Sequence, residues 1–351
     1  MNIVHVVGTG TIGEPLIGLL ADHRADFGID EVTFHKRTPL ITERGKVNDL
    51  VRRGAALAVD EDKRSTFEEL GHAPKYEARE AIERAKVVID CTPVGNDMKV
   101  DFYEKAVGPL GFMAQGSEFG FGKMYARGIN DSALVPGHDR FLHIVSCNTH
   151  NIAVLVKTLA MDEDGTNHLE DGKFICIRRS NDISQDDGFA PSPTVERHKD
   201  PRFGTHHARD AHGLFETVGY DLNLYSSALK LNTQYMHAIH FSLTLDRDMT
   251  LEEVKDRLAA NKRVAVTYKT SANSVFSFGR DHGYFGRILS QTVVATETLA
   301  VRNGNELVGF CFTPQDGNPL LSTLAATLWY LHPDEVDRRI DFLRPYLFQE
   351  V

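Results

Sequence analysis

The first part of the chain alternates short apolar runs with amphipathic stretches. Residues 3–7 form a β-branched apolar run typical of a strand, and the following stretch through Leu16, Leu19 and Leu20 has helical spacing. Further strands are expected near residues 31–34, 86–90, 112–114 and 141–145. Because strands alternate with helical stretches, residues 1–147 are predicted to form an α/β unit with a parallel sheet.

The pattern changes after residue 147. Residues 173–179, 229–245 and 263–268 look like longer strands, and a capping box at Thr250 and Glu253 starts a helix between the last two. This predicts an α+β unit with a mainly antiparallel sheet over residues 148–321. The segment 180–213 is longer than an ordinary connection, which is typical of a functional loop. The tail 322–351 is again helical and is expected to complete the first unit.

Composition and charge exclude several classes of protein. A length of 351 residues favours two domains at about 150 residues each. The formal charge of -10 argues against a nucleic-acid partner. No run approaches the roughly 20 apolar residues of a membrane helix, and no signal-peptide pattern is evident, so we expect a cytoplasmic protein without a membrane partner. The scattered cysteines Cys91, Cys147, Cys176 and Cys311 argue against both a zinc site and a disulfide framework.

A glycine motif follows the first predicted strand. Gly8, Gly10 and Gly13, with Thr11 and Ile12 between the last two, stand where a strand gives way to a helix. This context is the one that the dinucleotide-binding fingerprint requires, with the pyrophosphate at the helix N-terminus. A purely structural glycine turn is the alternative. The motif therefore predicts a Rossmann domain that binds NAD or NADP.

The end of the second predicted strand bears on the choice of cofactor. An NAD site usually has an acidic residue there, whereas this chain has His35, Lys36, Arg37 and Thr38. A carboxylate would repel a 2′-phosphate, but these residues can bind one. NADP is therefore favoured, with NAD still possible, and a solvated basic turn is the alternative interpretation.

Cys147 is placed where a nucleophile is often found. It lies between the predicted strand 141–145 and the apolar helical run 152–159, so its sulfur should lie near a helix N-terminus, where the thiol pKa is lowered. A buried structural cysteine fits this placement equally well. His237 and His240 are candidate bases, and because they lie three positions apart in a strand, only one can face the thiol.

Two pairs of residues suit anion binding. Arg178 and Arg179 end a predicted strand, and His206 and His207 lie in the long loop. Guanidinium groups match phosphate oxygens well, although adjacent arginines are often only surface residues. Adjacent histidines can also bind metal, but no carboxylate or cysteine spacing completes a metal site, so no metal is expected.

Taken in order, these motifs resemble those of archaeal-type (type II) phosphorylating glyceraldehyde-3-phosphate dehydrogenases. The resemblance spans nearly the whole chain and rests on the following segments: 8–13 (GTGTIG), 90–93 (DCTP), 115–118 (QGSE), 146–149 (SCNT), 178–179 (RR), 206–207 (HH) and 236–237 (MH). It implies a Rossmann domain joined to a catalytic domain, a homotetramer, and use of NADP or of both cofactors.

The resemblance also implies roles for individual residues. Cys147 would be the nucleophile and His237 the base, while Cys147 and Asn148 would stabilise the oxyanion. The resemblance adds cofactor contacts at Thr92, Pro93, Gln115 and Gly116. Substrate and phosphate contacts are implied at Thr149, His150, Arg178, Arg179, His206 and His207. The reaction implied is oxidation of a phosphorylated aldehyde through a cysteine thioester, which inorganic phosphate then attacks.

The chain departs from the family pattern at several positions. Val7, Ser117 and His150 replace residues usual in the three central motifs, and the stretch 320–323 lacks the C-terminal asparagine that helps to hold the nicotinamide. These departures indicate a divergent member acting on glyceraldehyde 3-phosphate or another aldehyde. The alternatives are a semialdehyde dehydrogenase of the aspartate-semialdehyde type and a catalytically silent NADP sensor.

Overall fold

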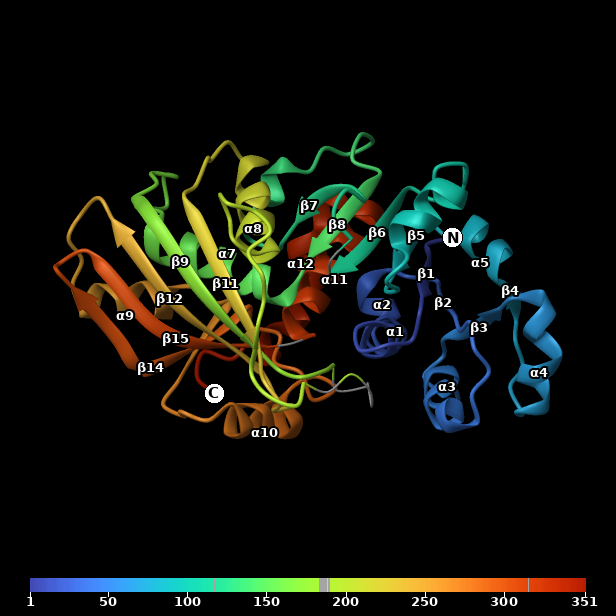
Figure 1. Ribbon diagram of the computed structural model, residues 1–351. Helices are drawn as coiled ribbons and strands as arrows, with labels where there is room; N and C mark the ends of the chain where they lie inside the picture. The colour runs from blue at the N-terminus through green and yellow to red at the C-terminus, as the bar shows by residue number, and fades with distance from the viewer. Residues whose placement is uncertain (117, 183–187, 189, 315) are drawn as a thin grey trace. The chain divides into compact units, whose positions relative to one another are not determined.

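The computed structural model describes the whole chain except residues 117, 183–187, 189 and 315 (Figure 1). The chain divides into two compact units. Unit 1 comprises Met1–Lys123, Leu134–Ile144 and Ser322–Asp341, and unit 2 comprises Met124–Ala133, Val145–Leu321 and Phe342–Val351. One sheet is a parallel α/β sheet and the other is mixed and mostly antiparallel, which confirms the expected fold class.

The first sheet has eight strands in the order β4-β3-β2-β1-β5-β6-β8-β7. Strands β1 to β6 pair in parallel, and β1 lies between β2 and β5, so the chain reverses its direction of winding at β1. Ligands of doubly wound folds bind at the carboxyl ends of the strands at such a point. The strands are β1 Ile3–Val7, β2 Glu31–His35, β3 Ala56–Val59, β4 Tyr76–Glu77, β5 Val87–Asp90, β6 Gly111–Gly116, β7 Lys123–Tyr125 and β8 Phe141–Val145.

Short helices connect these strands. The α-helices are α1 Gly13–Asp22, α2 Arg24–Phe27, α3 Arg44–Arg52, α4 Arg64–Glu69, α5 Ala78–Arg84 and α6 Gly95–Met98. The shorter helical turns are η1 Ile41–Glu43, η2 Glu61–Lys63, η3 Lys99–Tyr103 and η4 Asp131–Ala133, the last of which belongs to unit 2. Near the C-terminus follow α11 Gly317–Leu331, η5 Pro333–Glu335, α12 Val336–Ile340 and η6 Asp341–Tyr346.

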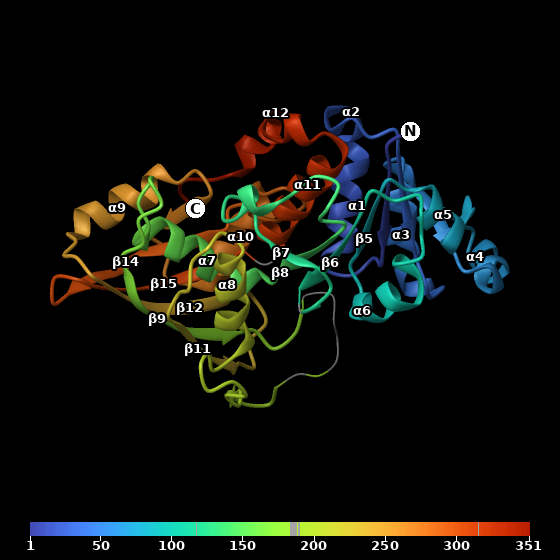
Figure 2. The ribbon, with the colours of Figure 1, turned by 90° about the horizontal axis from the view of Figure 1, so that it is seen from above.

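The second sheet has seven strands in the order β10-β11-β9-β12-β15-β14-β13. The strands are β9 Leu169–Arg178, β10 Thr194–Val195, β11 Leu224–Lys230, β12 His237–Leu245, β13 Val264–Thr267, β14 Thr292–Arg302 and β15 Glu306–Thr313. The helices of unit 2 are α7 Cys147–Ala160, α8 His206–Glu216, α9 Leu251–Ala260 and α10 Ala272–His282. Helices α7, α8 and α9 share one apolar core with the sheet (Figures 1 and 2).

Burial alternates along β12, which sets the direction of its two histidines. His237, Ile239 and Phe241 face the core shared with α7, whereas His240 faces the opposite side and stacks on Phe310 at 4.9 Å. A strand places successive side chains on opposite faces, so residues three apart cannot share one. His237 is therefore the histidine on the helix-covered face.

Several details differ from the elements expected from the sequence. The single strand predicted over residues 229–245 is wrong, because β11 and β12 flank β9 on opposite sides, one parallel and one antiparallel to it. The chain must reverse direction between Lys230 and His237 to make both pairings. Strands β3 and β4 are only four and two residues long, and no strand was expected there. The C-terminal helix begins at Gly317, and the chain after His332 breaks into short turns at Pro333.

Within the described residues, no helix is long and apolar enough to cross a membrane.

Candidate active site

The glycine turn at the end of β1 is shaped by three different requirements. Gly8 has a left-handed backbone (φ +93°), and a Cβ on Gly13 would lie 2.1 Å from the carbonyl oxygen of Gly8. At Gly10, by contrast, an added Cβ would meet nothing within 4 Å. Gly8 and Gly13 thus build the turn itself, whereas Gly10 leaves open space beside it, as close approach of a pyrophosphate requires.

The carboxyl end of β5 lies next to this turn. Asp90 is buried and accepts hydrogen bonds from the Thr92 N–H (2.8 Å) and hydroxyl (2.6 Å) and from the Tyr103 hydroxyl (2.7 Å). Burial raises the pKa of the Asp90 carboxyl. The Thr92 side chain, expected as a cofactor contact, thus holds the turn that leads into Pro93.

The basic residues after β2 differ in solvent exposure and in ion pairing. Lys36 is buried and paired with Glu43, whereas Arg37 and Thr38 are exposed, and Arg37 has no ion pair among the described residues. Sequence reasoning missed Lys46 of α3, whose Nζ donates to the Thr9 carbonyl at 3.2 Å and to Glu43 at 2.8 Å. No local pattern pointed to it, because the fold brings α3 to the glycine turn.

The segment at the end of β6 shows a buried amide. Gln115 donates from Nε2 to Thr323 Oγ1 of α11 at 2.9 Å, and its Oε1 is buried without a hydrogen-bond partner among the described residues. Gly116 has φ +74°, and its carbonyl lies 2.8 Å from His143 Nε2. Ser117, one of the noted departures, lies outside the described residues.

Cys147 is the first residue of α7, which confirms its expected placement. The Ser146 hydroxyl caps the helix by accepting from the Thr149 N–H at 3.3 Å and lies 2.9 Å from the Thr149 hydroxyl. Thr149 is therefore occupied as part of the cap and is fully buried.

The expected lowering of the Cys147 pKa is wrong for the chain by itself. Burial raises the pKa of the Cys147 thiol to about 12, and the Asp316 carboxylate adds to this effect, while Arg179 and Arg178 oppose it. Desolvation of the thiolate thus outweighs the favourable position at the helix N-terminus. The other three thiols also have pKa values raised by burial.

The bonding of His237 defines its tautomer. The ring is buried, and its Nδ1 accepts a hydrogen bond from the backbone N–H of Arg179 at 3.0 Å. Burial and the two neighbouring arginines hold the pKa of His237 well below its usual range, so the ring is neutral. With Nδ1 an acceptor, the single ring proton must sit on Nε2. His237 thus offers a hydrogen-bond donor at Nε2.

Asn148 and His207 belong to one buried hydrogen-bond chain. Thr313 donates to Asn148 Oδ1 at 3.1 Å, and the Asn148 amide nitrogen lies 3.4 Å from His207 Nε2. His207 Nδ1 lies 3.0 Å from the Thr205 hydroxyl, which lies 2.6 Å from the Ser226 hydroxyl. Both nitrogens of His207 are thus used inside the protein, which leaves none for the phosphate contact expected from the sequence.

The hydrogen-bond chain also extends from Thr313 toward Cys311. Asn151 donates to the Thr313 hydroxyl at 2.9 Å, and the Cys311 thiol donates to Asn151 Oδ1 at 3.3 Å. Because an amide orients its donor and acceptor oppositely, every bond can run in one direction from Cys311 to Ser226. The hydrogen-bond chain fixes the orientation of the Asn148 side chain, with one of its two amide protons directed at His207.

His150 lies on α7, and its ring contacts the backbone of that helix. The ring is fully buried, and its Nδ1 lies 3.0 Å from the Ser146 carbonyl oxygen. The ring thus donates to its own helix, one turn back.

The structure directs Arg178, the last residue of β9, and Arg179, the residue after it, to different pockets. Arg178 pairs with Glu196 and lines a pocket of about 560 Å³. Arg179 is buried, bonds to Asp182 at 3.1 Å and lines a different pocket of about 200 Å³ with Asp316 and Arg287. Successive residues of a strand point to opposite faces, which explains the separation. The first pocket is also lined by Arg197, Lys199, Asp200, Gly204, Thr205, His206 and Arg209.

Asn318 is a further residue that sequence reasoning missed. Its amide nitrogen donates to the carbonyls of Cys147 (2.9 Å) and Gln291 (3.1 Å), and its Oδ1 is buried without a partner in the described part of the chain. Asn318 lies two residues before the stretch 320–323, in which an asparagine was expected from the resemblance. Among the described residues, no three His, Cys, Asp or Glu side chains are arranged to hold a metal.

Comparisons with known proteins agree with the sequence motifs. No family model matches the chain. A protein of Methanobacterium bryantii named glyceraldehyde-3-phosphate dehydrogenase is 29% identical over 322 residues, which is 87% of this chain and 86% of the relative. Proteins of the same name from Metallosphaera sedula (26%, 73% of each chain) and Methanobrevibacter smithii (24%, 88% and 87%) also align. The resemblance is thereby confirmed, and the low identity makes this chain a divergent relative.

Proposed function

We propose that this chain, as a divergent relative of glyceraldehyde-3-phosphate dehydrogenases, is an oxidoreductase that oxidises an aldehyde with NADP through a thioester on Cys147. Glyceraldehyde 3-phosphate is the leading substrate and inorganic phosphate the leading acceptor. The observation that carries the proposal is the environment of Cys147. Its thiol is half-buried at a helix N-terminus, and the positive charges of Arg178 and Arg179 both act to lower its pKa. These arginines line separate pockets, as a reaction with two anionic reactants requires.

Unit 1 fits a dinucleotide. The open space at Gly10, the helix that begins at Gly13 and the switch point at β1 together suit a pyrophosphate. Arg37 and Thr38 would hold a 2′-phosphate, whereas Lys36 is already neutralised by Glu43. When bound, the dinucleotide supplies the hydride acceptor.

The chemistry of unit 2 centres on the Cys147 sulfur. The thiolate adds to the aldehyde carbon to give a hemithioacetal, and loss of hydride from that carbon leaves a thioester. A phosphate oxygen then attacks the thioester carbonyl, which releases an acyl phosphate and restores the thiolate. Because burial disfavours the thiolate, Arg178 and Arg179 must provide much of its stabilisation.

His237 acts in this scheme as a hydrogen-bond donor. Its Nε2 carries the ring proton because Nδ1 is taken by the Arg179 N–H. A donor at Nε2 stabilises the oxyanion of the hemithioacetal, together with the backbone N–H groups at the start of α7. This differs from the role of base that the resemblance implies, and it follows from the tautomer.

The pocket of Arg178 is the better candidate for inorganic phosphate. It is lined by four Lys and Arg side chains against two carboxylates, and His206 also faces it. Charge-assisted hydrogen bonds from guanidinium groups are well suited to phosphate oxygens. The ring of His207 packs against that of His206, with 3.9 Å between the ring centroids.

We also propose that the chain forms a homo-oligomer, a tetramer by resemblance. The sheet face opposite α7 carries a row of neighbouring residues across three strands: Ile175, His240 and Phe310. Ile175 is 43% exposed and Phe310 38%. Exposed apolar rows of this kind are typical of subunit contacts. Light scattering after size-exclusion chromatography tests the proposal, and a monomer at micromolar concentration would contradict it.

The activity is tested by following reduced nicotinamide at its absorbance band. Purified protein is mixed with NADP and glyceraldehyde 3-phosphate, with and without inorganic phosphate, and with the Cys147→Ser variant as control. Reduction that depends on both phosphate and Cys147 supports the proposal. NADP binding without reduction of any aldehyde would favour the sensor, an alternative to which the raised thiol pKa lends some support.

A further inference from the structure

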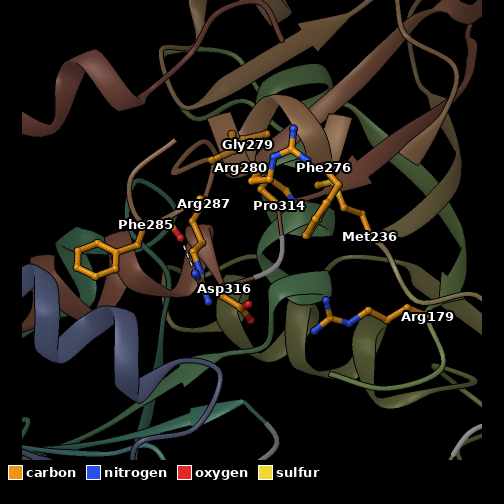
Figure 3. Close-up of a pocket in the computed structure, with 11 residues that line it drawn as sticks. Arg179, Met236, Phe276, Gly279, Arg280, Phe285, Arg287, Pro314 and Asp316 are labelled. Atoms are coloured by element: carbon orange, nitrogen blue, oxygen red, sulfur yellow. Dashed lines mark hydrogen bonds between the residues drawn. The ribbon is translucent and has the colours of Figure 1, made fainter. Parts of the chain in front are cut away.

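A pocket of about 680 Å³ lies at the end of α7 that is remote from Cys147. Its walls come from the last turn of α7, from the loop after this helix, and from the end of α9 with the loop into β13. All of these segments belong to unit 2. Among the described residues, the pocket shares no lining residue with the pocket of Arg178 or with that of Arg179, which Figure 3 shows. It is therefore a separate cavity, which the proposed function does not use.

The position of the pocket along α7 separates it from the reaction. Lys157, which lines it, follows Cys147 by ten residues (157 minus 147) on the same helix, a distance of about 15 Å at the usual helical rise. A small aldehyde attached to the Cys147 sulfur does not span that distance. The volume lies within the range of roughly 300–1,000 Å³ that is typical of small-molecule sites. A molecule bound here is thus neither the aldehyde nor the acceptor phosphate.

Positive charge is in excess on the walls of this pocket. Four of the lining side chains are Lys or Arg and two are carboxylates, in a chain whose formal charge is -10. One cation and one carboxylate neutralise each other, because Arg257 forms an ion pair with Asp162. Lys157 and Lys262, by contrast, have no ion pair within the described part of the chain, and the Lys157 Nζ donates to the Ile129 carbonyl at 3.2 Å. The charge of these two lysines is thus available to an anion from solution.

The cations on these walls act on one another. Burial lowers the pKa of Lys157, and the charge of Arg263 lowers it further, while Asp131 opposes the shift. Cations in the last turn of a helix offset the helix dipole, which accounts for Lys157 and Arg257. Lys262 and Arg263 lie beyond the last residue of α9, so the dipole does not explain why they line the same pocket. An anion placed between these side chains relieves their mutual repulsion.

We propose that this pocket is a second ligand site, in which Lys157, Lys262 and Arg263 bind the phosphate monoester of a small metabolite. A phosphate monoester has a charge of about −1.5 to −2 at neutral pH, which matches the excess of cations over carboxylates on the walls. Its oxygens accept charge-assisted hydrogen bonds from ammonium and guanidinium groups alike. Met161 and Ala260 also line the pocket and offer apolar surface to the organic part of the metabolite. The inference concerns binding alone and does not depend on the proposed function.

Pyridoxal 5′-phosphate is a suitable probe because it carries both a phosphate monoester and an aldehyde. The aldehyde condenses with an unprotonated lysine amine to give an imine and water, and added borohydride reduces the imine to a stable amine. The lowered pKa of Lys157 favours this reaction near neutral pH. The Cys147→Ser protein is used so that the thiol does not compete for the aldehyde, and mass spectrometry after digestion locates the label. We expect Lys157 or Lys262 to react at least about tenfold faster than Lys255, an exposed lysine of α9 outside the pocket.

Protection against labelling separates recognition of the phosphate from reactivity of the amine. Glucose 6-phosphate at saturation should slow the labelling of Lys157 and Lys262 at least about tenfold, whereas glucose, which lacks the phosphate, should have no effect. Labelling of Lys255 should not respond to either compound. Equal labelling of all three lysines, or equal protection by glucose and glucose 6-phosphate, would overturn the proposal.

Calorimetric titration of glucose 6-phosphate tests the residues directly. Its Kd should rise at least about tenfold when Lys157→Gln and Lys262→Gln are combined, and should be unchanged in the matched control Lys255→Gln. Lys262 is exposed, so a loss in Lys262→Gln alone does not come from unfolding. A loss of binding in Arg178→Met but not in the double variant would assign the ligand to the pocket of Arg178 and overturn the proposal. Neither measurement needs turnover, so a protein that binds here but oxidises no aldehyde refutes the proposed function and leaves this site standing.

Discussion

The charge of Asp316 should control the reactivity of Cys147. The carboxylate is the second cause, after burial, of the high pKa of the thiol, and burial raises the pKa of Asp316 itself to about 7. The substitution Asp316→Asn removes the charge while keeping the shape. Asparagine tolerates the left-handed backbone that this position requires, so the local structure should be retained.

The size of the effect follows from the coupling of the two groups. A nearby like charge shifts the pKa of a buried group by about one unit, which is about 1.4 kcal/mol. Well below the thiol pKa, one unit changes the thiolate population tenfold. Because Asp316 in the wild-type protein becomes charged as the pH rises through about 7, the variant should react about tenfold faster above pH 8 and about equally below pH 6.

The assay is alkylation by iodoacetamide between about pH 5.5 and pH 9, with labelling at Cys147 followed by mass spectrometry. The Cys147→Ser variant reports labelling of the other thiols, of which Cys91 is the most accessible. With a thiol pKa of about 12, the thiolate fraction at pH 8 is about one in ten thousand, so the wild-type reaction should be slow. A variant-to-wild-type ratio that does not change with pH would refute the coupling. Labelling of the wild type as fast as free cysteine would refute the argument from burial.

Three further predictions test other parts of the structure. Thr313→Val removes the central hydroxyl of the buried hydrogen-bond chain and leaves one buried polar atom of Asn148 and one of Asn151 without a partner, so it should destabilise unit 2 by about 2–4 kcal/mol in urea unfolding. Thr244→Val, on the uncovered face of the same sheet, should change the free energy of unfolding little. Equal effects of the two substitutions would contradict a stabilising role for the buried hydrogen-bond chain. Gly13→Ala places a Cβ 2.1 Å from a backbone carbonyl and should lower the melting temperature markedly, whereas Gly10→Ala should fold normally and weaken NADP binding about tenfold, as measured by calorimetry. Normal NADP affinity in Gly10→Ala would argue against the turn as the pyrophosphate site. Arg37→Ala should raise the Kd for NADP about tenfold and leave that for NAD unchanged, and a parallel loss for both cofactors would show that Arg37 does not contact the 2′-phosphate.

Local patterns in the sequence were sufficient for the fold class and for the start of the key helix. The glycine turn, the strand at 141–145 and the first residue of α7 follow from the chemistry of adjacent residues, such as the Ser146 cap. The burial alternation of β12 is likewise visible in the sequence. These features depend on period and on capping, which act over a few residues.

Only the tertiary structure decided how these residues are used. Arg178 and Arg179 are neighbours in sequence, but the sheet turns them into different pockets. His207 is taken up by a hydrogen-bond chain whose members lie as far apart as Thr205 and Cys311. The pKa of Cys147 is raised because the thiol is buried beside Asp316, 169 positions away in the sequence (316 minus 147). Desolvation and charge act through space, so their balance at a site depends on contacts between distant segments, which no local pattern specifies.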